Sequence, residues 1–270
     1  MRLLFFGDVV GQPGRRAMYE ALGRAREEIG VDFVVANGEN AAGGFGITPS
    51  ICEEFFDSGV DVITTGNHVW DQREIIPYFD QEPRLLRPHN YPIGTPGTGA
   101  RLFTTNSGKK VIVINVMLRL FMESLDDPFQ GVNQFLDGHR LSKSVDAILV
   151  DVHGEATSEK QAIAHMLDGK VSAVVGSHTH VPTADGRVLK NGTGFQTDAG
   201  MCGDYDSVIG GDKNTWVRRF KTRMPVGRVS PPNGIGTACG VLFDLDVRTG
   251  LSKNVMTLVQ GPHLKARWPK

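Results

Sequence analysis

Features that mark secreted, membrane-inserted or nucleic-acid-coating proteins are scarce in this sequence of 270 residues. Its three cysteines, Cys52, Cys202 and Cys239, are too widely spaced for a CxxC pair or a disulfide framework, which favours a reducing compartment. The formal net charge of −1 provides no overall field to attract DNA or an anionic membrane. The apolar run at residues 3–6 is too short to span a membrane and lacks a signal-peptide cleavage region. We therefore expect a cytoplasmic protein with no membrane partner.

The first third of the chain alternates strands and helices. Hydrophobic residues make up 40% and charged residues 22%, as in ordinary globular enzymes. Short apolar runs predict strands at residues 3–6, 33–36 and 62–65. Between them, Pro13 opens a helix to about Ile29, and Thr48-Pro49 fits the N-cap and first position of another. This β-α-β-α-β order is typical of parallel strands.

The rest of the chain adds further strands and two irregular insertions. Insertions are expected at residues 117–140, with partial helix as a lid, and at residues 203–236. With no repeat or low-complexity linker, we expect one domain over residues 1–270. A helix that Thr157 caps is expected between the last two buried strands. The remaining strands are predicted at residues 85–88, 101–103, 111–116, 147–152 and 171–175, and then, with antiparallel pairing, at 187–190, 194–198, 238–246 and 254–259.

Polar side chains follow the apolar runs at their carboxyl ends. Parallel strands bring these ends to one edge of a sheet, where ligands bind in open α/β folds. Two carboxylates, two amides and three or four imidazoles would be costly to bury unpaired. A divalent metal resolves this, and without a thiolate Fe(II), Mn(II) or Zn(II) suits the set, although not as structural zinc. The residues are Asp8, Glu39, Asn40, Asn67, His68, His153, His178 and His180.

The number of candidate ligands exceeds the needs of one ion. Two ions about 3.5–4 Å apart, bridged by a carboxylate and a water, would use the set and supply hydroxide for attack on a phosphoester. Simpler interpretations remain for single residues: Asp8 as a helix N-cap, Asn40 as a turn former, and His153 as a hydrogen-bonded histidine. His178 and His180 alternate, so in a strand both would point to one face.

The candidate residues lie in five short motifs, Gly7-Asp8, Gly38-Glu39-Asn40, Gly66-Asn67-His68, Val152-His153-Gly154 and Gly176-Ser177-His178-Thr179-His180. In this order, the motifs resemble the calcineurin-like metallophosphoesterases. Residues 197–203 extend the similarity to the YmdB subgroup of bacterial phosphodiesterases. Two positions depart from the superfamily pattern and match the subgroup: Val10 stands where a histidine is usual, and Gly38-Glu39-Asn40 where Gly-Asp is usual.

The resemblance implies a fold and a role for each site residue. The fold is an α/β four-layer α/β/β/α sandwich, with two packed mixed β-sheets flanked by helices and the metal site at the strand carboxyl ends. His68 would protonate the leaving oxygen, or stabilise charge, without binding metal. One ion is implied on Asp8, Glu39, Asn40 and His180, and a second on Glu39, Asn67, His153 and His178, with Glu39 bridging.

The implied substrates are 2′,3′-cyclic nucleotides, attacked by a metal-bridging hydroxide. A phosphomonoesterase or nucleotidase is the enzymatic alternative. The other alternative is a regulatory, RNA-associated protein in which the metal site is secondary. Iron or manganese is expected before zinc.

Several residues near or outside the motifs have simpler expected roles. Trp70 and Asp71 could buttress His68, although packing is their expected role. Cys202 could line the site, although inert burial is expected. Basic residues in the second insertion could steer an anionic substrate or contact RNA, and could equally form a solvated face or a subunit contact in a homo-oligomer. No aromatic pattern is found to accompany them, which weakens RNA binding. The basic residues are Lys213, Arg218, Arg219, Lys221, Arg223 and Arg228.

Overall fold

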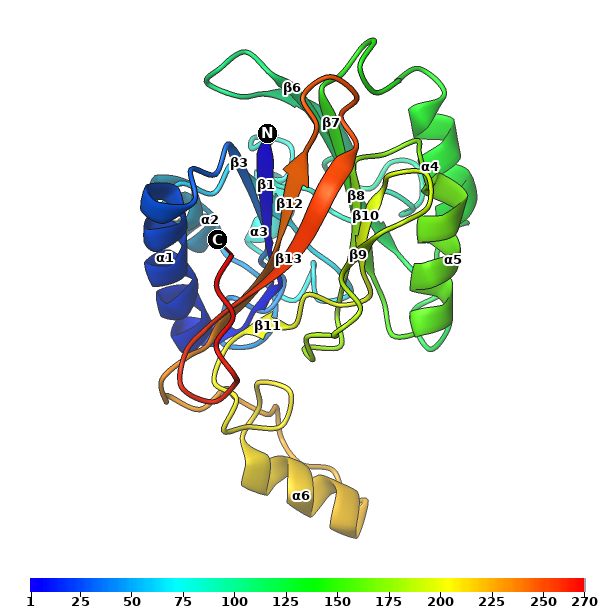
Figure 1. The fold of residues 1–270 in the computed structure, drawn as a ribbon. Helices are drawn as coiled ribbons and strands as arrows, with labels where there is room; N and C mark the ends of the chain where they lie inside the picture. The colour runs from blue at the N-terminus through cyan, green and yellow to red at the C-terminus, as the bar shows by residue number, and fades with distance from the viewer. Residues whose placement is uncertain (270) are drawn as a thin grey trace.

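Two β-sheets lie face to face between two layers of helices in the computed structural model, which describes residues 1–269 (Figure 1). The strands are β1 (Arg2–Phe6), β2 (Asp8–Val9), β3 (Phe33–Asn37), β4 (Val62–Thr64), β5 (Ala100–Thr104), β6 (Lys110–Met117), β7 (Ala147–His153), β8 (Ala173–Ser177), β9 (Arg187–Val188), β10 (Gly194–Gln196), β11 (Met201–Cys202), β12 (Ala238–Leu245) and β13 (Ser252–Gln260). The helices are α1 (Gly11–Glu28), α2 (Pro49–Asp57), α3 (Ile75–Tyr78), α4 (Pro128–Leu136), α5 (Thr157–Leu167) and α6 (Lys213–Thr222).

The strand order places like-directed strands side by side. One sheet runs β13-β12-β1-β3-β4 and the other β5-β6-β7-β8-β10-β9, with a two-stranded β11-β2 ribbon at their end. β1, β3 and β4 are parallel, as are β6, β7, β8 and β10, whereas β12 and β13 pair antiparallel. The carboxyl ends of the parallel strands therefore meet at one edge, the lower one in Figure 1.

Side chains alternate between two apolar cores along the buried strands. In β1, Leu4 and Phe6 belong to the core beneath α1 and α2, while Leu3 and Phe5 belong to the core shared with the second sheet. A third apolar core joins that second sheet to α4 and α5. Successive strand side chains point to opposite faces, so each buried strand serves two cores. The predicted four-layer α/β/β/α sandwich is confirmed.

Some element boundaries differ from the predictions. α1 begins at Gly11, so Pro13 lies in its first turn, where the missing N–H has no helical partner to lose. Thr48 caps α2 as predicted, its side chain accepting a hydrogen bond from Ile51 N at 3.3 Å. Thr157 was wrongly predicted as a cap, because the N-cap residue of α5 is Ala156.

Two strand predictions also need correction. Residues 85–88 form isolated bridges and not a strand, since Leu85 pairs with Ile63 and Leu86 with Thr98 on different segments. The strand predicted at residues 171–175 is β8, two residues later. The ribbon between β2 and β11 was not predicted, because two-residue strands have no detectable alternation.

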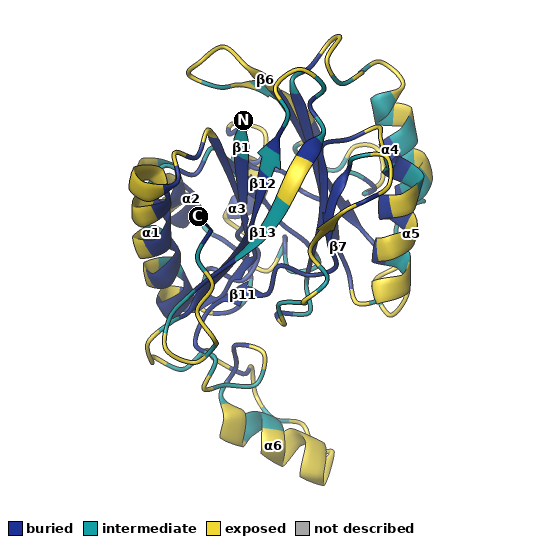
Figure 2. Cartoon of the chain, in the orientation of Figure 1, coloured by how far each residue is buried: buried dark blue, intermediate teal, exposed yellow. Residues whose placement is uncertain are grey.

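Both insertions contain a helix. The side chain of Asp127 caps α4 by accepting hydrogen bonds from the backbone N–H groups of Phe129 and Gln130. The side chain of Asp212 caps α6 by accepting from Thr215 N at 2.8 Å. None of the described residues of α6 is buried, and the helix stands away from the body beyond the strand carboxyl ends (Figures 1 and 2). Within residues 1–269, no helix combines the length and apolar character that a membrane crossing needs.

Candidate metal centre

Four predicted ligands meet around one imidazole nitrogen. His153 Nε2 lies 3.1 Å from Glu39 Oε1, 3.0 Å from Asn67 Oδ1 and 3.2 Å from His178 Nδ1. Ligand atoms of Glu39, His153 and His178 all lie within 4.8 Å of one another. These residues follow or end β3, β4, β7 and β8. One proton on His153 cannot satisfy so many facing lone pairs, whereas a cation of mixed oxygen and nitrogen preference can.

The remaining predicted ligands lie beside this group. Asp8 Oδ1 is 3.7 Å from His180 Nε2 and 3.9 Å from His153 Nδ1. Among the described residues, neither Asp8 Oδ1 nor Asn40 Oδ1 has a hydrogen-bond partner, although both are buried. Asn40 also shapes its loop, because its Nδ2 donates to Gly44 O at 3.1 Å. Buried oxygens without a donor are costly, so their chemistry fits a cation at this place.

The three clustered imidazoles are oriented through their outward nitrogens. Each of these nitrogens contacts an acceptor, so the inward nitrogen is left with its lone pair towards the cluster. This is the tautomer that a metal requires. The contacts are His153 Nδ1 to Ser177 Oγ at 2.9 Å, His178 Nε2 to Glu155 Oε2 at 3.4 Å, and His180 Nδ1 to Ile209 O at 2.8 Å.

A buried carboxylate determines how Ser177 acts. Ser177 Oγ donates to Asp151 Oδ1 at 2.7 Å, so its oxygen accepts from His153 Nδ1. Thr64 Oγ1 and Asn37 Nδ2 donate to the other oxygen of Asp151, at 2.6 and 3.3 Å. Burial raises the pKa of Asp151 to about 6. Sequence reasoning missed this group, although an acid inside the apolar run of residues 147–152 was a usable signal.

The loop after β8 holds its histidines in strained backbone conformations. His178 has φ 98° and His180 φ 65°, a region that non-glycine residues rarely adopt. Neither residue lies in a strand, because β8 ends at Ser177, so the alternation that would point both side chains to one face does not apply. They still reach the cluster, because the left-handed turns redirect each side chain separately: His178 towards His153, and His180 towards Asp8.

A buried ion pair supports this loop. Lys160 Nζ donates to Ser177 O and to Asp198 Oδ2, both at 2.8 Å. Asp198 Oδ2 also accepts from Thr179 N at 3.1 Å. The side chains of Lys160 and Asp198 are fully buried. Sequence reasoning missed Lys160, although its spacing from Ile163, Ala164 and Leu167 places it on the buried face of α5.

The electrostatics favour the ligand forms of Glu39 and His178. Burial alone would raise the pKa of Glu39, but the adjoining His153 outweighs it and lowers that pKa. Burial, with His153 beside it, lowers the pKa of His178 to about 3. Burial opposes a charge on His153, yet Glu39 and Asp8 raise its pKa overall. The proton they hold there is what a bound cation would replace.

His68 lies next to the cluster but is oriented by other groups. Its backbone N–H donates to Glu39 Oε2 at 3.0 Å, and its Nδ1 lies 3.1 Å from Asp71 Oδ2. The ring of Phe45 packs edge-on against the imidazole of His68, with the two ring centroids 4.9 Å apart. Of the two roles considered for Asp71, the structure shows the buttressing of His68 and not packing, because its carboxylate contacts the imidazole. Trp70 does pack, against Phe79 and Tyr91.

The described part of the chain holds its three cysteines as free, buried thiols. Cys202 Sγ lies 3.3 Å from Cys239 O. Burial raises the pKa of the Cys202 thiol, which keeps it protonated and unreactive. The burial of Cys202 and the raised pKa of its thiol agree with the expectation that this cysteine is unreactive.

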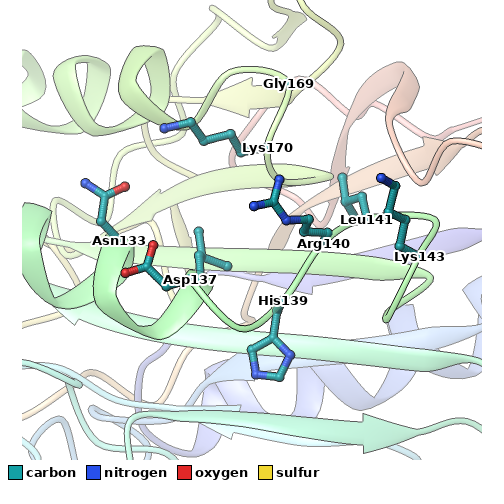
Figure 3. Close-up of a pocket in the computed structure, with 9 residues that line it drawn as sticks. Asn133, Asp137, His139, Arg140, Leu141, Lys143, Gly169 and Lys170 are labelled. Carbon is teal, nitrogen blue, oxygen red and sulfur yellow. The ribbon is translucent and has the colours of Figure 1, made fainter.

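A separate cavity lies far from the cluster. It has a volume of about 390 Å³ and is lined by residues after α4, including His139 and Arg140, and by Gly169 and Lys170 (Figure 3). Because Lys170 precedes β8, this cavity lies at the amino ends of the strands. His139 accordingly takes no part in the metal centre, as expected from its place outside the motifs.

Two facing mixed sheets with such a cluster at their carboxyl edge place the chain in the metallophosphoesterase class. More narrowly, it belongs to the YmdB-like protein family, whose sequence model matches residues 4–258. The resemblance found from the motifs is thus confirmed.

Individual relatives cover almost the whole chain. A Bacillus subtilis protein named 2′,3′-cyclic-nucleotide 2′-phosphodiesterase is 46% identical over 92% of this chain and 93% of its own. A solved hypothetical protein from Thermus thermophilus has a TM-score of 0.88 at 39% identity, covering 97% of this chain and 100% of its own. A solved phosphatase from Mycoplasma pneumoniae has a TM-score of 0.86 at 30% identity, covering 96% of this chain and 92% of its own.

Proposed function

We propose that this protein is a metal-dependent phosphodiesterase that hydrolyses 2′,3′-cyclic nucleotides. The observation that carries the proposal is the convergence of Glu39, Asn67, His153 and His178 on one point, with His68 beside it. The name of the Bacillus subtilis relative supports the substrate class. A phosphodiester presented at this edge would meet ligating, orienting and proton-donating groups together.

The residues divide into two sets of metal ligands. Glu39, Asn67, His153 and His178 would hold one divalent ion, and Asp8, Asn40 and His180 would hold a second together with Glu39. Two bound ions would supply hydroxide near neutral pH and positive charge for the phosphoryl oxygens. Iron or manganese is proposed before zinc, because the donors are carboxylate, amide and imidazole without thiolate.

His68 would act on the leaving group. Asp71 accepts at Nδ1, so Nε2 is the nitrogen that can give a proton to the departing oxygen. In a 2′,3′-cyclic nucleotide, water adds to phosphorus, the P–O2′ bond breaks, and the 2′ oxygen leaves with the proton. The product is a nucleoside 3′-monophosphate. Ser177 and Asp151 keep His153 in its ligand tautomer throughout.

The test combines elemental analysis with product identification. We expect two divalent ions per chain and conversion of 2′,3′-cyclic AMP to 3′-AMP. Glu39→Gln should lose metal and activity together. His68→Ala should keep its metal and lose about 10²–10⁴-fold in kcat, while His139→Ala serves as the matched histidine control. A metal-free protein that turns over the substrate at the same rate would contradict the proposal.

A phosphomonoesterase is the second candidate, supported by the name of the solved Mycoplasma pneumoniae phosphatase. Faster turnover of 3′-AMP or 5′-AMP than of 2′,3′-cyclic AMP would favour it. Since the ligands are the same in both cases, only the substrate comparison separates them. A cytoplasmic location, a homo-oligomeric state, an RNA-associated role and the single domain stay predictions.

A further inference from the structure

A cavity of about 450 Å³ opens beside the candidate metal centre. Asn40, His68 and His180 form its inner side, so it is continuous with the place proposed for the scissile phosphate. Its outer side comes from the second insertion, including α6 and the segment that follows it. Trp216 and Arg219 are the residues of α6, the projecting helix in Figure 1, that line this cavity.

The outer side presents flat rings and positive charge. Trp216 and Phe45 both line the cavity, and so do Arg219 and Arg228. The guanidinium carbon of Arg219 lies 5.0 Å from the Trp216 ring centroid, and that of Arg228 lies 4.3 Å from the Phe45 ring centroid. This pairing of aromatic rings with basic residues was not predicted, because no aromatic pattern was found among the basic residues in the sequence. Such a combination suits a ligand that is both aromatic and anionic.

Nothing in the core explains why a tryptophan occupies this helix. Of the described residues of α6, none is buried, and its exposure is visible in Figure 2. Trp216 lies so close to Gly211 that a Cβ added there would come within 2.5 Å of its Nε1. The Gly211 backbone and the ring of Phe220, which stacks on the indole with ring centroids 5.4 Å apart, thus position Trp216 at the cavity.

The volume favours a single nucleoside over a polymer. Small-molecule sites occupy about 300–1,000 Å³, and this cavity lies in that range. Phe45 lies 4.9 Å from His68 between ring centroids, and both line the same cavity as Trp216, so a nucleoside attached to a phosphate at the cluster would extend into this cavity. A strand of RNA would instead need an open groove with successive stacking rings.

We propose that this cavity is the nucleoside subsite of the enzyme, with the base held between Phe45 and Trp216 and with Arg219 adding positive charge. The subsite binds a purine or pyrimidine nucleoside that carries the cyclic phosphate. This assignment rests on the proposed function, and it adds the residues that would distinguish a nucleotide from any other cyclic phosphodiester.

The experiment uses the metal-loaded, full-length protein with two substrates. One is 2′,3′-cyclic AMP, and the other is ethylene phosphate, which has the five-membered cyclic diester but no nucleoside. Trp216→Ala should raise KM for 2′,3′-cyclic AMP by about tenfold or more, the size of a lost base–aromatic contact. Its kcat/KM for ethylene phosphate should stay within about twofold of wild type. Trp216→Phe should restore most of the nucleotide KM.

Val217→Ala is the matched control, because Val217 is on the same helix, is 52% exposed and does not line the cavity. Val217→Ala should leave both the KM for 2′,3′-cyclic AMP and the kcat/KM for ethylene phosphate unchanged. If Trp216→Ala lowers turnover of both substrates equally, the helix shapes the metal centre and the subsite assignment is overturned. If wild type hydrolyses both substrates and Trp216→Ala changes neither, the assignment is likewise overturned while the proposed function stands.

Binding can be measured without any reaction. In a Trp70→Phe/Trp268→Phe background, Trp216 is the single tryptophan of the chain, and adenosine should quench its fluorescence saturably. Arg219→Ala should weaken the corresponding titration with 3′-AMP more than the one with adenosine. Failure of the wild type to hydrolyse any diester would overturn the proposed function, whereas absent quenching would overturn the subsite alone.

Discussion

Replacing Lys160 by methionine tests the support of the histidine loop most directly. The lysine and Asp198 are both fully buried, and their nearest charged atoms are 2.8 Å apart. Methionine keeps most of the side-chain volume, so the loss comes from an uncompensated carboxylate and not from a cavity. Asp198 retains hydrogen bonds from Thr179 N and Gly200 N. Removing one partner of such a pair costs about 3–5 kcal/mol.

The assay is urea unfolding of metal-free protein, followed by circular dichroism. Lys160→Met should lower the free energy of unfolding by about 3–5 kcal/mol, and Lys160→Met/Asp198→Asn should lose less than the sum of its single variants. Lys109→Met removes a partly exposed ion pair with Asp146 and should cost less than about 1 kcal/mol. A cost for Lys160→Met no larger than that of this control would refute the reasoning.

Three further changes test other parts of the structure. Gly66→Ala should reduce bound metal and activity together, measured by elemental analysis and turnover, because its Cβ would overlap His153 Nε2 and crowd Glu39; full metal content would contradict this. Asp71→Asn should lower kcat about tenfold with metal content unchanged, since it orients His68; an unchanged kcat would rule out that role. Burial alone would raise the pKa of Asp185, but hydrogen bonds, chiefly from Thr197, hold it below its ordinary value of 3.8. Its stabilisation is therefore present above that value and lost as pH falls through the lower native pKa, so the difference in unfolding free energy between wild type and Asp185→Asn should shrink from about pH 6 to about pH 3. A difference in unfolding free energy that stays constant over this pH range would contradict the predicted role of Asp185.

The strands and the polar residues at their ends were predictable because local patterns encode them. Short β-branched runs predict buried strands, and polar residues after them predict an edge site. Asp8, Glu39, Asn67 and His153 follow or end such runs, and the structure brings them together. The parallel order of the first strands was enough to foresee that their ends would meet.

Other features depend on contacts between segments far apart in the chain. Asp151 acts on His153 through a serine of the neighbouring strand, which no spacing within β7 could indicate. The positive φ angles of His178 and His180 reverse an alternation that a strand would have imposed. The cavity between the metal centre and α6 combines Phe45 with Trp216, which come from segments far apart in the chain.

The sequence by itself determined which residues are buried strands and which polar groups stand at their ends, because hydrophobic periodicity and glycine turns are local properties. Only the tertiary structure decided which nitrogen of each histidine faces the cluster, and which carboxylate orients which imidazole. Those choices depend on hydrogen bonds between neighbouring strands and loops, and the distances that set them exist only once both sheets have packed together.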